Sequence, residues 1–335
     1  MAKRCCTPTA PSSGVITPTS TPSTPTSAPT TPTTPASAAP PAAAAGAPTS
    51  SGAGAPTSTV AGGPAGRPSP AREWCEVPAG TFTMGNDGDD AVPGDGEGPA
   101  RRVTLPAFAI GAATVTNADF AEFVRATRHV TDAERLGSSF VFYLQVPADR
   151  RQAAPQVVAG LPWWLPVAHA SWQRPEGPGS HVRDRMAHPV VHVSWDDAVA
   201  WCRWAGARLP EEAEWERAAR GGLEGRRYAW GDELLDERAE PRCNIFRGAF
   251  PNAPAAGWAP GPVAARSGEA NGFGLFNVCG NVWEWCADGL EGGARPLRGG
   301  SFLCHDSYCN RYRVAARSAN TAVTSTSNIG FRVAR

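Results

Sequence analysis

All twelve tryptophans of this 335-residue chain lie after Arg72, and this uneven distribution limits where a hydrophobic core can form. The first aromatic residue is Trp74, and before Gly66 the only charged residues are Lys3 and Arg4. Ordering each residue costs about 1–2 kcal/mol of backbone entropy, which a Pro-, Thr-, Ala- and Ser-rich segment cannot offset by burying apolar side chains. The sequence therefore predicts a disordered tail over residues 1–71 and one folded domain over residues 72–335.

The charge pattern of the domain argues against several classes of partner. With Lys3, Arg4 and Arg67 set aside, 28 basic residues stand against 31 acidic ones, so no basic field indicates nucleic acid or a membrane. No apolar run approaches the ~20 residues of a membrane span, and the basic start has no apolar region behind it, unlike a signal peptide. We therefore expect a cytoplasmic protein, whose nine cysteines are more often reduced, metal-bound or catalytic than disulfide-paired. Cys5 and Cys6, in the tail, receive no assignment.

The pattern of apolar and turn residues predicts an α+β domain of many short elements. Residues 76–85 alternate like a strand that ends in a glycine turn, and residues 102–110 resume an extended pattern. The acidic, glycine-rich residues 86–98 between them are expected to form a surface loop. Residues 130–187 show little periodicity, and we expect their large aromatic side chains (Trp163, Trp164 and Trp172) to anchor them.

Three helices are indicated by capping residues and an apolar face. The first is capped by Thr116 and runs to residue 127. The second starts after Ser194 in a capping-box pattern and ends at Gly206. The third has Pro210 in its first turn and ends at Gly221. Three of the four glutamates at 211, 212, 214 and 216 lie where the helix dipole favours acidic residues, so the group is expected to form a solvated helix start and not acid/base catalysts.

Residues 188–195 (HPVVHVSW) are expected to form a strand, because Pro189 and the valines after it disfavour a helix. His188 and His192 would suit a metal ion if they were one helical turn apart. On a strand they are ~13 Å apart, too far for one ion, so structural roles are expected for both.

Residues 299–318 concentrate side chains that carry chemistry. Cys304 and Cys309 follow a Gly-Gly pair, and His305 lies between them. A disulfide, a zinc site, or a site for copper(I) or redox chemistry would each fit these residue types. Zinc usually takes four ligands, whereas copper(I) favours thiolates and can be held by two. A hydrolase triad of Ser301, His305 and Asp306 is disfavoured, because no strand-to-helix elbow holds the serine.

Residues 271–289 are dense in asparagine, glycine and tryptophan. Asn277 and Glu284, with backbone carbonyls between them, could bind calcium, which prefers oxygen ligands. A tight turn packed by tryptophans would explain the same stretch. Cys279 and Cys286 stay unassigned.

Seven landmarks occur in order along residues 74–335: VPAGTFTMG, TVTNADFAEFVRAT, HPVVHVSWDDAVAWCRWAGARLPEEAEWERAARGG, YAWGDE, NGFGLFNVCGNVWEW, RGGSFLCHDSYCNRYRVAARS and SNIGFR. Together they resemble the formylglycine-generating enzymes, also called sulfatase-modifying factors. The cysteine-containing landmark is the most specific, since it matches the catalytic pair of that family. The resemblance implies a single loop-rich α+β fold related to C-type lectins.

The resemblance also implies an activity. It implies a monomeric oxidase that uses copper(I), O2 and a thiol reductant to convert a cysteine in a Cys-x-Pro-x-Arg sequence of an unfolded sulfatase to Cα-formylglycine. It implies that Cys304 and Cys309 hold copper(I) as a near-linear dithiolate and that the substrate cysteine adds a third thiolate. Further matching positions line the oxygen pocket (Ser301 and Trp283) or support the site and bind substrate (Arg311, Asn328 and His305).

Structural calcium is implied as well. One site would comprise Asn277, Gly280, Val282 and Glu284, with Gly280 and Val282 contributing backbone carbonyls. Asn244 and Ile245 look like part of a second site. Residues 255–257 read Ala-Ala-Gly where the family has an aspartate ligand, so the second site lacks its acid.

Two rival functions are weighed against the oxidase. An iron oxygenase of the same superfamily would need a His-x3-His-x-Glu motif, and here Ser194 replaces the acid. A non-catalytic, lectin-like or sulfatase-binding member would have no chemical need for two neighbouring thiols. The oxidase is therefore the function that the sequence favours.

Overall fold

The computed structural model describes Pro8, residues 73–153, Val158 and residues 160–335. These described residues belong to one compact unit. The tail predicted over residues 1–71 lies outside the described residues, Pro8 excepted. In the part of the chain that the structure describes, no helix is long and apolar enough to cross a membrane.

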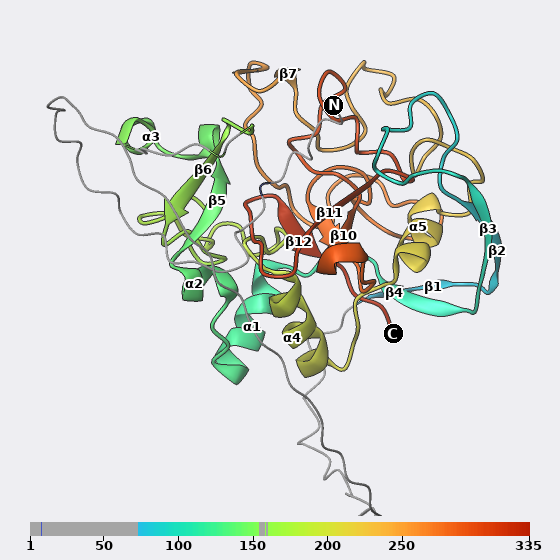
Figure 1. Cartoon of the computed structure of the whole chain (residues 1–335), viewed down its shortest axis with the longest axis horizontal. Helices are drawn as coiled ribbons and strands as arrows, with labels where there is room; N and C mark the ends of the chain where they lie inside the picture. The colour runs from blue at the N-terminus through green and yellow to red at the C-terminus, as the bar shows by residue number, and fades with distance from the viewer. Residues whose placement is uncertain (1–7, 9–72, 154–157, 159) are drawn as a thin grey trace, which may run out of the picture. The chain divides into compact units, whose positions relative to one another are not determined.

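Short strands pair into one four-stranded sheet and four two-stranded ladders among the described residues (Figure 1). The sheet has the order β11-β10-β9-β12, and β12 runs parallel to β9. Its strands are β9 (Trp283–Trp285), β10 (Ala294–Arg298), β11 (Arg317–Thr321) and β12 (Ile329–Phe331). The ladders pair β1 (Trp74–Val77) with β4 (Phe108–Gly111), β2 (Gly80–Met84) with β3 (Arg101–Leu105), β5 (Ser138–Phe142) with β6 (Trp164–Ala168), and β7 (Gly248–Ala249) with β8 (Ala253–Pro254). The loop-rich α+β class predicted from the sequence is confirmed.

The α-helices are short, and the predicted N-caps of two of them are confirmed. They are α1 (Asn117–Thr127), α2 (Asp132–Leu136), α3 (Ala148–Ala153), α4 (Trp195–Ala205) and α5 (Glu212–Arg220), and 3-10 turns span Tyr143–Gln145 and Glu291–Gly293. The Thr116 hydroxyl accepts from the Asp119 N–H at 3.2 Å, and the Ser194 hydroxyl accepts from the Asp197 N–H at 3.0 Å. Helix α4 ends at Gly206, as predicted. Helices α1 and α4 lie side by side (Figure 1).

The strand predicted over residues 188–195 is wrong. Within it the structure has one isolated bridge, between Pro189 and Thr116, and the backbone of His192 is left-handed with φ of 59°. The ring of His192 explains this conformation, because Nδ1 lies 2.8 Å from the Ser139 hydroxyl and Nε2 lies 2.9 Å from the Pro175 carbonyl oxygen. Burial lowers the pKa of His192 to about 4, so the ring is neutral. The structural role predicted for this histidine is confirmed.

Large aromatic side chains fill the core. Five tryptophans are completely or almost completely buried: Trp164, Trp201, Trp215, Trp283 and Trp285. In the long loop, Trp172 is also buried, and its ring packs 5.3 Å from that of Phe120 in α1. The predicted anchoring of the described part of this loop by tryptophans is therefore confirmed for Trp164 and Trp172, whereas Trp163 is half-buried.

Candidate functional site

Two glycines after β10 close the loop that carries the cysteine pair. Gly299 and Gly300 have φ of +90° and +74°, a region that side-chain-bearing residues rarely adopt. A Cβ at Gly300 would lie 2.6 Å from the carbonyl oxygen of Arg311, so only glycine allows this close approach. The backbone before the loop, at Gly300, therefore lies directly against the backbone after it, at Arg311. We call residues 301–310 the cysteine loop.

Both thiols of the cysteine loop are buried. Cys304 is 0% exposed and Cys309 is 3% exposed. The Ser301 N–H donates to Cys304 Sγ at 3.4 Å, a contact that suits negative charge on the sulfur. The Cys309 N–H donates to the His305 carbonyl at 3.0 Å, so the chain folds back between the two cysteines.

A buried polar group supports the start of the loop. The Asn328 amide donates to the Ser301 hydroxyl at 2.9 Å, and the Asn328 carbonyl accepts from the Trp283 N–H at 2.9 Å. Within the described part of the chain, the buried indole N–H of Trp283 has no hydrogen-bond partner. Such an orphaned donor is expensive in a core, which makes it a candidate contact for a small bound molecule. The Ser301 hydroxyl is engaged by Asn328, in agreement with the rejection of a hydrolase triad.

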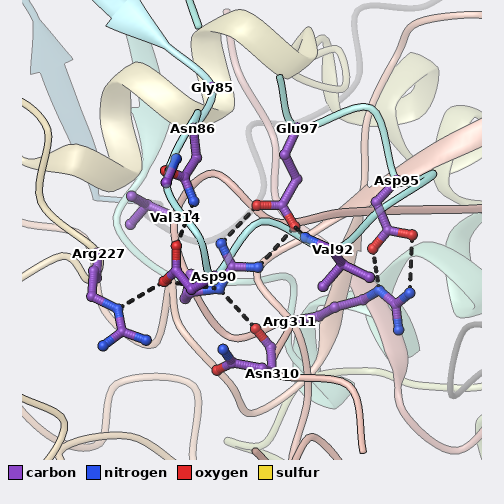
Figure 2. Close-up of polar contacts among 12 residues, drawn as sticks. Gly85, Asn86, Asp90, Val92, Asp95, Glu97, Arg227, Asn310, Arg311 and Val314 are labelled. Atoms are coloured by element: carbon purple, nitrogen blue, oxygen red, sulfur yellow. Dashed lines mark hydrogen bonds and ion pairs between the residues drawn. The ribbon is translucent and has the colours of Figure 1, made fainter. Parts of the chain in front are cut away.

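The segment after Cys309 is held by the acidic residues 86–98, which we call the acidic loop. Asp95 faces Arg311 in Figure 2, and the Arg311 guanidinium donates to its carboxylate at 2.9 Å. Glu97 binds Arg313 through two hydrogen bonds of 2.6 and 2.8 Å, and both side chains are 1% exposed. The prediction of a surface loop is therefore confirmed for most of its residues and wrong for Glu97, which is buried against Arg313.

These acidic residues were missed by the sequence interpretation. The sequence contains one sign of this pairing: the two acidic residues Asp95 and Glu97 are two positions apart, as are the two arginines at 311 and 313. The pairing joins residues that are 216 positions apart, so no local pattern indicates it. Arg311 itself is 1% exposed and ion-paired, which places it as a support of the cysteine loop.

The predicted solvation of the α5 glutamates is wrong for three of the four. Glu212, Glu214 and Glu216 are buried, and each accepts from arginine side chains. Although burial favours the neutral carboxyl, Arg317 and Arg298 lower the pKa of Glu212 below its usual value. The N-cap position of α5 is Glu211, so Pro210 lies before the helix and not in its first turn.

The predicted calcium ligands differ in how well they fit an ion. The Asn277 amide nitrogen has four oxygen atoms within 3.1–3.3 Å, from Ala264, Ala265 and Ser267. An NH2 group has only two hydrogens, so it cannot donate to four oxygen atoms at once. If the amide is flipped, its own oxygen joins these four, and a group of oxygen atoms of this kind suits a bound cation. The Glu284 carboxylate fits less well, because it already accepts from Arg332 and from the Trp215 indole.

The remaining calcium candidates lie inside the domain: Gly280, Val282 and Ile245 are buried and Asn244 is half-buried. The Gly280 N–H donates to the Gly299 carbonyl, and Val282 is buried beside β9. In the proposed second site the Asn244 amide donates to the Gly261 carbonyl and to Asn281, while Ile245 is a core residue. The structure therefore offers the second site no acidic ligand at residues 255–257.

The other cysteine pair has the character of core residues. Cys279 and Cys286 are buried and have free thiols. Burial raises the pKa of Cys279 to about 12 and holds that of Cys286 well above its usual value, so both stay protonated at neutral pH. No cluster of three or more His, Cys, Asp or Glu side chains suited to a metal ion occurs among the described residues. A four-ligand zinc site thus has no support there.

An open cavity of about 450 Å³ adjoins the cysteine loop. His305 and Asp306 line it together with Phe246, Trp258 and Tyr312. The Phe246 N–H donates to the Cys304 carbonyl at 3.0 Å, so the cavity wall is attached directly to the loop. Such a space, half apolar and edged by charge, can hold an extended peptide next to the cysteine loop.

Comparison with known proteins places this architecture in a family. The family model of the sulfatase-modifying factor enzyme 1-like domain matches residues 61–335. A formylglycine-generating enzyme of Streptomyces coelicolor is 52% identical over 81% of this chain and 91% of its own length. The formylglycine-generating enzyme of Thermomonospora curvata is 51% identical over 79% of this chain and 93% of its own length. An inactive C-alpha-formylglycine-generating enzyme 2 of Bos taurus is 45% identical over 77% of this chain and 86% of its own length.

A solved structure shares the fold. PvdO from Pseudomonas aeruginosa superposes with a TM-score of 0.55 at 23% identity, covering 79% of this chain and 94% of that protein. At this identity the likeness concerns the fold alone. The family match over most of the chain, together with the half-identical bacterial relatives, identifies the chain as a member of the sulfatase-modifying factor enzyme 1-like family.

Proposed function

We propose that this protein oxidises a cysteine within a Cys-x-Pro-x-Arg sequence of an unfolded sulfatase polypeptide to Cα-formylglycine, with O2, a thiol reductant and copper(I). The observation that carries the proposal is the buried pair Cys304 and Cys309 in a loop closed by Gly300 against Arg311. The half-identical relatives named formylglycine-generating enzyme support the same reaction. The protein is proposed to act as a cytoplasmic monomer.

The donor set of the cysteine loop fits copper(I). Two thiols stand without a further cluster of metal-ligating side chains among the described residues, and copper(I) is the soft ion that two thiolates can hold. When bound, the ion supplies a coordinatively open centre for oxidation of a third thiolate by O2. Cys304 and Cys309 would hold it.

Surrounding residues position the reactants and exclude water. The Ser301 hydroxyl is oriented by Asn328, and the Trp283 indole N–H, which has no partner among the described residues, offers one fixed donor toward oxygen atoms that gain negative charge during the oxidation. Conversion of a thiol to an aldehyde by O2 releases the sulfur as hydrogen sulfide. Of the two oxygen atoms, one is accounted for by the aldehyde and the other is reduced to water. That balance requires two reducing equivalents, which the thiol reductant provides.

The adjoining cavity is proposed to bind the peptide in an extended form. A substrate modified before folding must lie extended, because its side chains have no fixed partners of their own. Asp306 is largely exposed at the cavity and supplies a negative charge for the arginine of the motif. His305, half-buried beside it, is assigned to peptide contact.

Two rivals are less well supported. Overall similarity does not separate catalytic from inactive relatives, since an inactive one is 45% identical, but the retained thiol pair favours catalysis. Hercynine oxygenase of Mycolicibacterium smegmatis is 34% identical, and this chain spans 51% of its length. An iron site at His192 is disfavoured, because both ring nitrogens already have hydrogen-bond partners.

Incubation with copper, a thiol reductant, O2 and a synthetic Cys-x-Pro-x-Arg peptide is expected to yield an aldehyde, detected by mass spectrometry. The matched control is a Ser-x-Pro-x-Arg peptide, which has no thiol and should stay unchanged. The reaction is also expected to stop when O2 is removed. A wild-type protein that leaves the thiol peptide unmodified under these conditions contradicts the proposed function.

A structural calcium ion at Asn277 is proposed for the same protein, on the oxygen-rich surroundings of its amide. Addition of EGTA is expected to lower the melting temperature of the wild type, because an ion bound only to the folded state stabilises it by mass action. Asn277→Ala should melt lower and lose the response to EGTA. A wild type whose melting is insensitive to EGTA, after removal of all other divalent ions, would count against the site.

A further inference from the structure

The cavity next to the cysteine loop already holds an arginine of the chain itself. Arg247 and Glu240 both line this cavity, and Nη1 of the Arg247 guanidinium donates to the Glu240 carboxylate. The two side chains keep 34% and 55% of their surface exposed, so the pair can be reached from solvent. A guanidinium paired with a carboxylate is the contact that the arginine of a Cys-x-Pro-x-Arg peptide would itself make in this cavity.

This ion pair lies at a suitable distance from the cysteine loop. Arg247 directly follows Phe246, whose N–H donates to the Cys304 carbonyl at 3.0 Å. In an extended Cys-x-Pro-x-Arg peptide the arginine stands four residues after the cysteine, which corresponds to ~13 Å along the chain. A peptide whose cysteine lies at the cysteine loop can therefore extend its arginine into the part of the cavity that Arg247 occupies.

Glu240 is held in place, whereas only the side chain of Arg247 needs to move. The Glu240 N–H donates to the Asp236 carboxylate at 2.9 Å, and the Glu240 carbonyl accepts from the Asp236 N–H at 2.8 Å. The Arg247 carbonyl accepts from the Ala255 N–H at 2.8 Å, which fixes the backbone beside the guanidinium. Exchange of one arginine for another at Glu240 thus requires rotation of one side chain and no change of fold.

The Arg247 side chain is also imperfectly bound. Its Nε–H is buried and has no hydrogen-bond partner in the part of the chain that the structure describes. A buried donor without an acceptor is unfavourable, and water would satisfy it once the side chain leaves the cavity. Ion pairs with this much exposure contribute little to stability, so loss of the Glu240 contact opposes the exchange only weakly.

We propose that Arg247 stands in for the substrate arginine: it neutralises Glu240 in the free protein, and the arginine of the peptide displaces it. This inference rests on the proposed function, and it adds Glu240 to Asp306 as a residue that selects arginine. Asp306 lines the same cavity, so once Arg247 has left, two carboxylates face one cation from the peptide. A peptide without a positive charge gains nothing from the displacement, which favours arginine over a neutral side chain of the same shape.

Calorimetric titration of the full chain with a Ser-x-Pro-x-Arg peptide, which binds without reacting, tests the displacement. Arg247→Met removes the charge and keeps a long side chain, so the Kd is expected to fall about two- to fivefold, the range that a partly exposed ion pair allows. Glu240→Gln is expected to raise the Kd by a similar factor. Adding Arg247→Met to Glu240→Gln should then change nothing further, because both residues act through one contact.

Two controls decide whether charge is the cause. The same peptide with citrulline in place of arginine is neutral and nearly isosteric, and its Kd should not respond to Arg247→Met. Arg226→Met removes an exposed arginine that pairs with Asp232 outside this cavity, and it should keep the wild-type Kd for both peptides. Equal Kd values of Arg247→Met and the wild type for the arginine peptide would overturn the proposal, as would an equal gain for both peptides.

The exchanged pair, Glu240→Arg with Arg247→Glu, gives a test in which neither charge is left unpaired. The preference for Ser-x-Pro-x-Arg over Ser-x-Pro-x-Glu should shift toward the glutamate peptide, and an unchanged preference would contradict the role of Glu240. The expected Kd shifts in a protein that makes no aldehyde would contradict the proposed function alone. Aldehyde formation by a protein whose Kd responds to none of these variants would contradict the displacement alone.

Discussion

Replacing either Cys304 or Cys309 with serine is expected to lower the turnover of a Cys-x-Pro-x-Arg peptide by about 1,000-fold or more. Serine is nearly isosteric with cysteine, so the buried loop keeps its shape. A hydroxyl is a hard, protonated group at neutral pH and does not hold copper(I), whereas a thiolate does. Loss of one ligand leaves a single thiolate, which cannot retain the ion in the presence of a competing thiol reductant. Each variant should therefore lose copper binding in anaerobic equilibrium dialysis together with its activity.

The second cysteine pair provides the matched control. Cys279 and Cys286 are as deeply buried as the first pair, and burial raises the pKa of both thiols. Cys279→Ser and Cys286→Ser should melt at a lower temperature but keep copper binding and most of the activity. If Cys279→Ser removed copper as completely as Cys304→Ser does, the assignment of the metal to the cysteine loop would be wrong.

Local patterns predicted the parts of the fold that are held by neighbours in the sequence. The capping residues Thr116 and Ser194 bond to residues three positions away, so a short window contains the whole interaction. The α+β class of many short elements followed from the apolar and turn pattern, and the importance of Cys304 and Cys309 followed from the resemblance of the landmark that contains them. In these cases residue type and spacing already contain the information that decides the structure.

Interactions between distant segments decided the parts that the sequence interpretation missed. Residues 188–195 have the apolar composition of a strand, but the His192 ring bonds to Ser139 and Pro175 and turns the backbone. Glu212 and Glu216 sit where a helix dipole favours acidic residues, and partners from β10 and β11 bury them. A one-dimensional pattern shows the charge of such residues but not which distant residue neutralises it.

Replacing Glu97 with alanine is expected to destabilise the domain by about 3 kcal/mol or more, because it leaves the buried Arg313 guanidinium with only the more exposed Asp90 carboxylate, 3.7 Å away, as an acidic partner. Glu97 accepts two hydrogen bonds from Arg313 and a third from the Val92 N–H at 3.1 Å, so one substitution removes three contacts. For a domain of this size the melting temperature should fall by roughly 6–15 °C. Because Arg313 follows Cys309 by four residues, we also expect weaker copper binding below the melting temperature.

Two further variants distinguish this account from a general loss of charge. Glu76→Ala removes a carboxylate whose partner, Arg335, is largely exposed, and such pairs contribute about 0–1 kcal/mol, so its melting temperature should hardly change. The double variant Glu97→Leu with Arg313→Met removes both buried charges and should recover much of the stability lost in Glu97→Ala. The remaining deficit in copper binding would then measure how far the ion pair positions the cysteine loop. A double variant that melts below Glu97→Ala would instead show that the buried guanidinium deprived of Glu97 is not the source of the destabilisation.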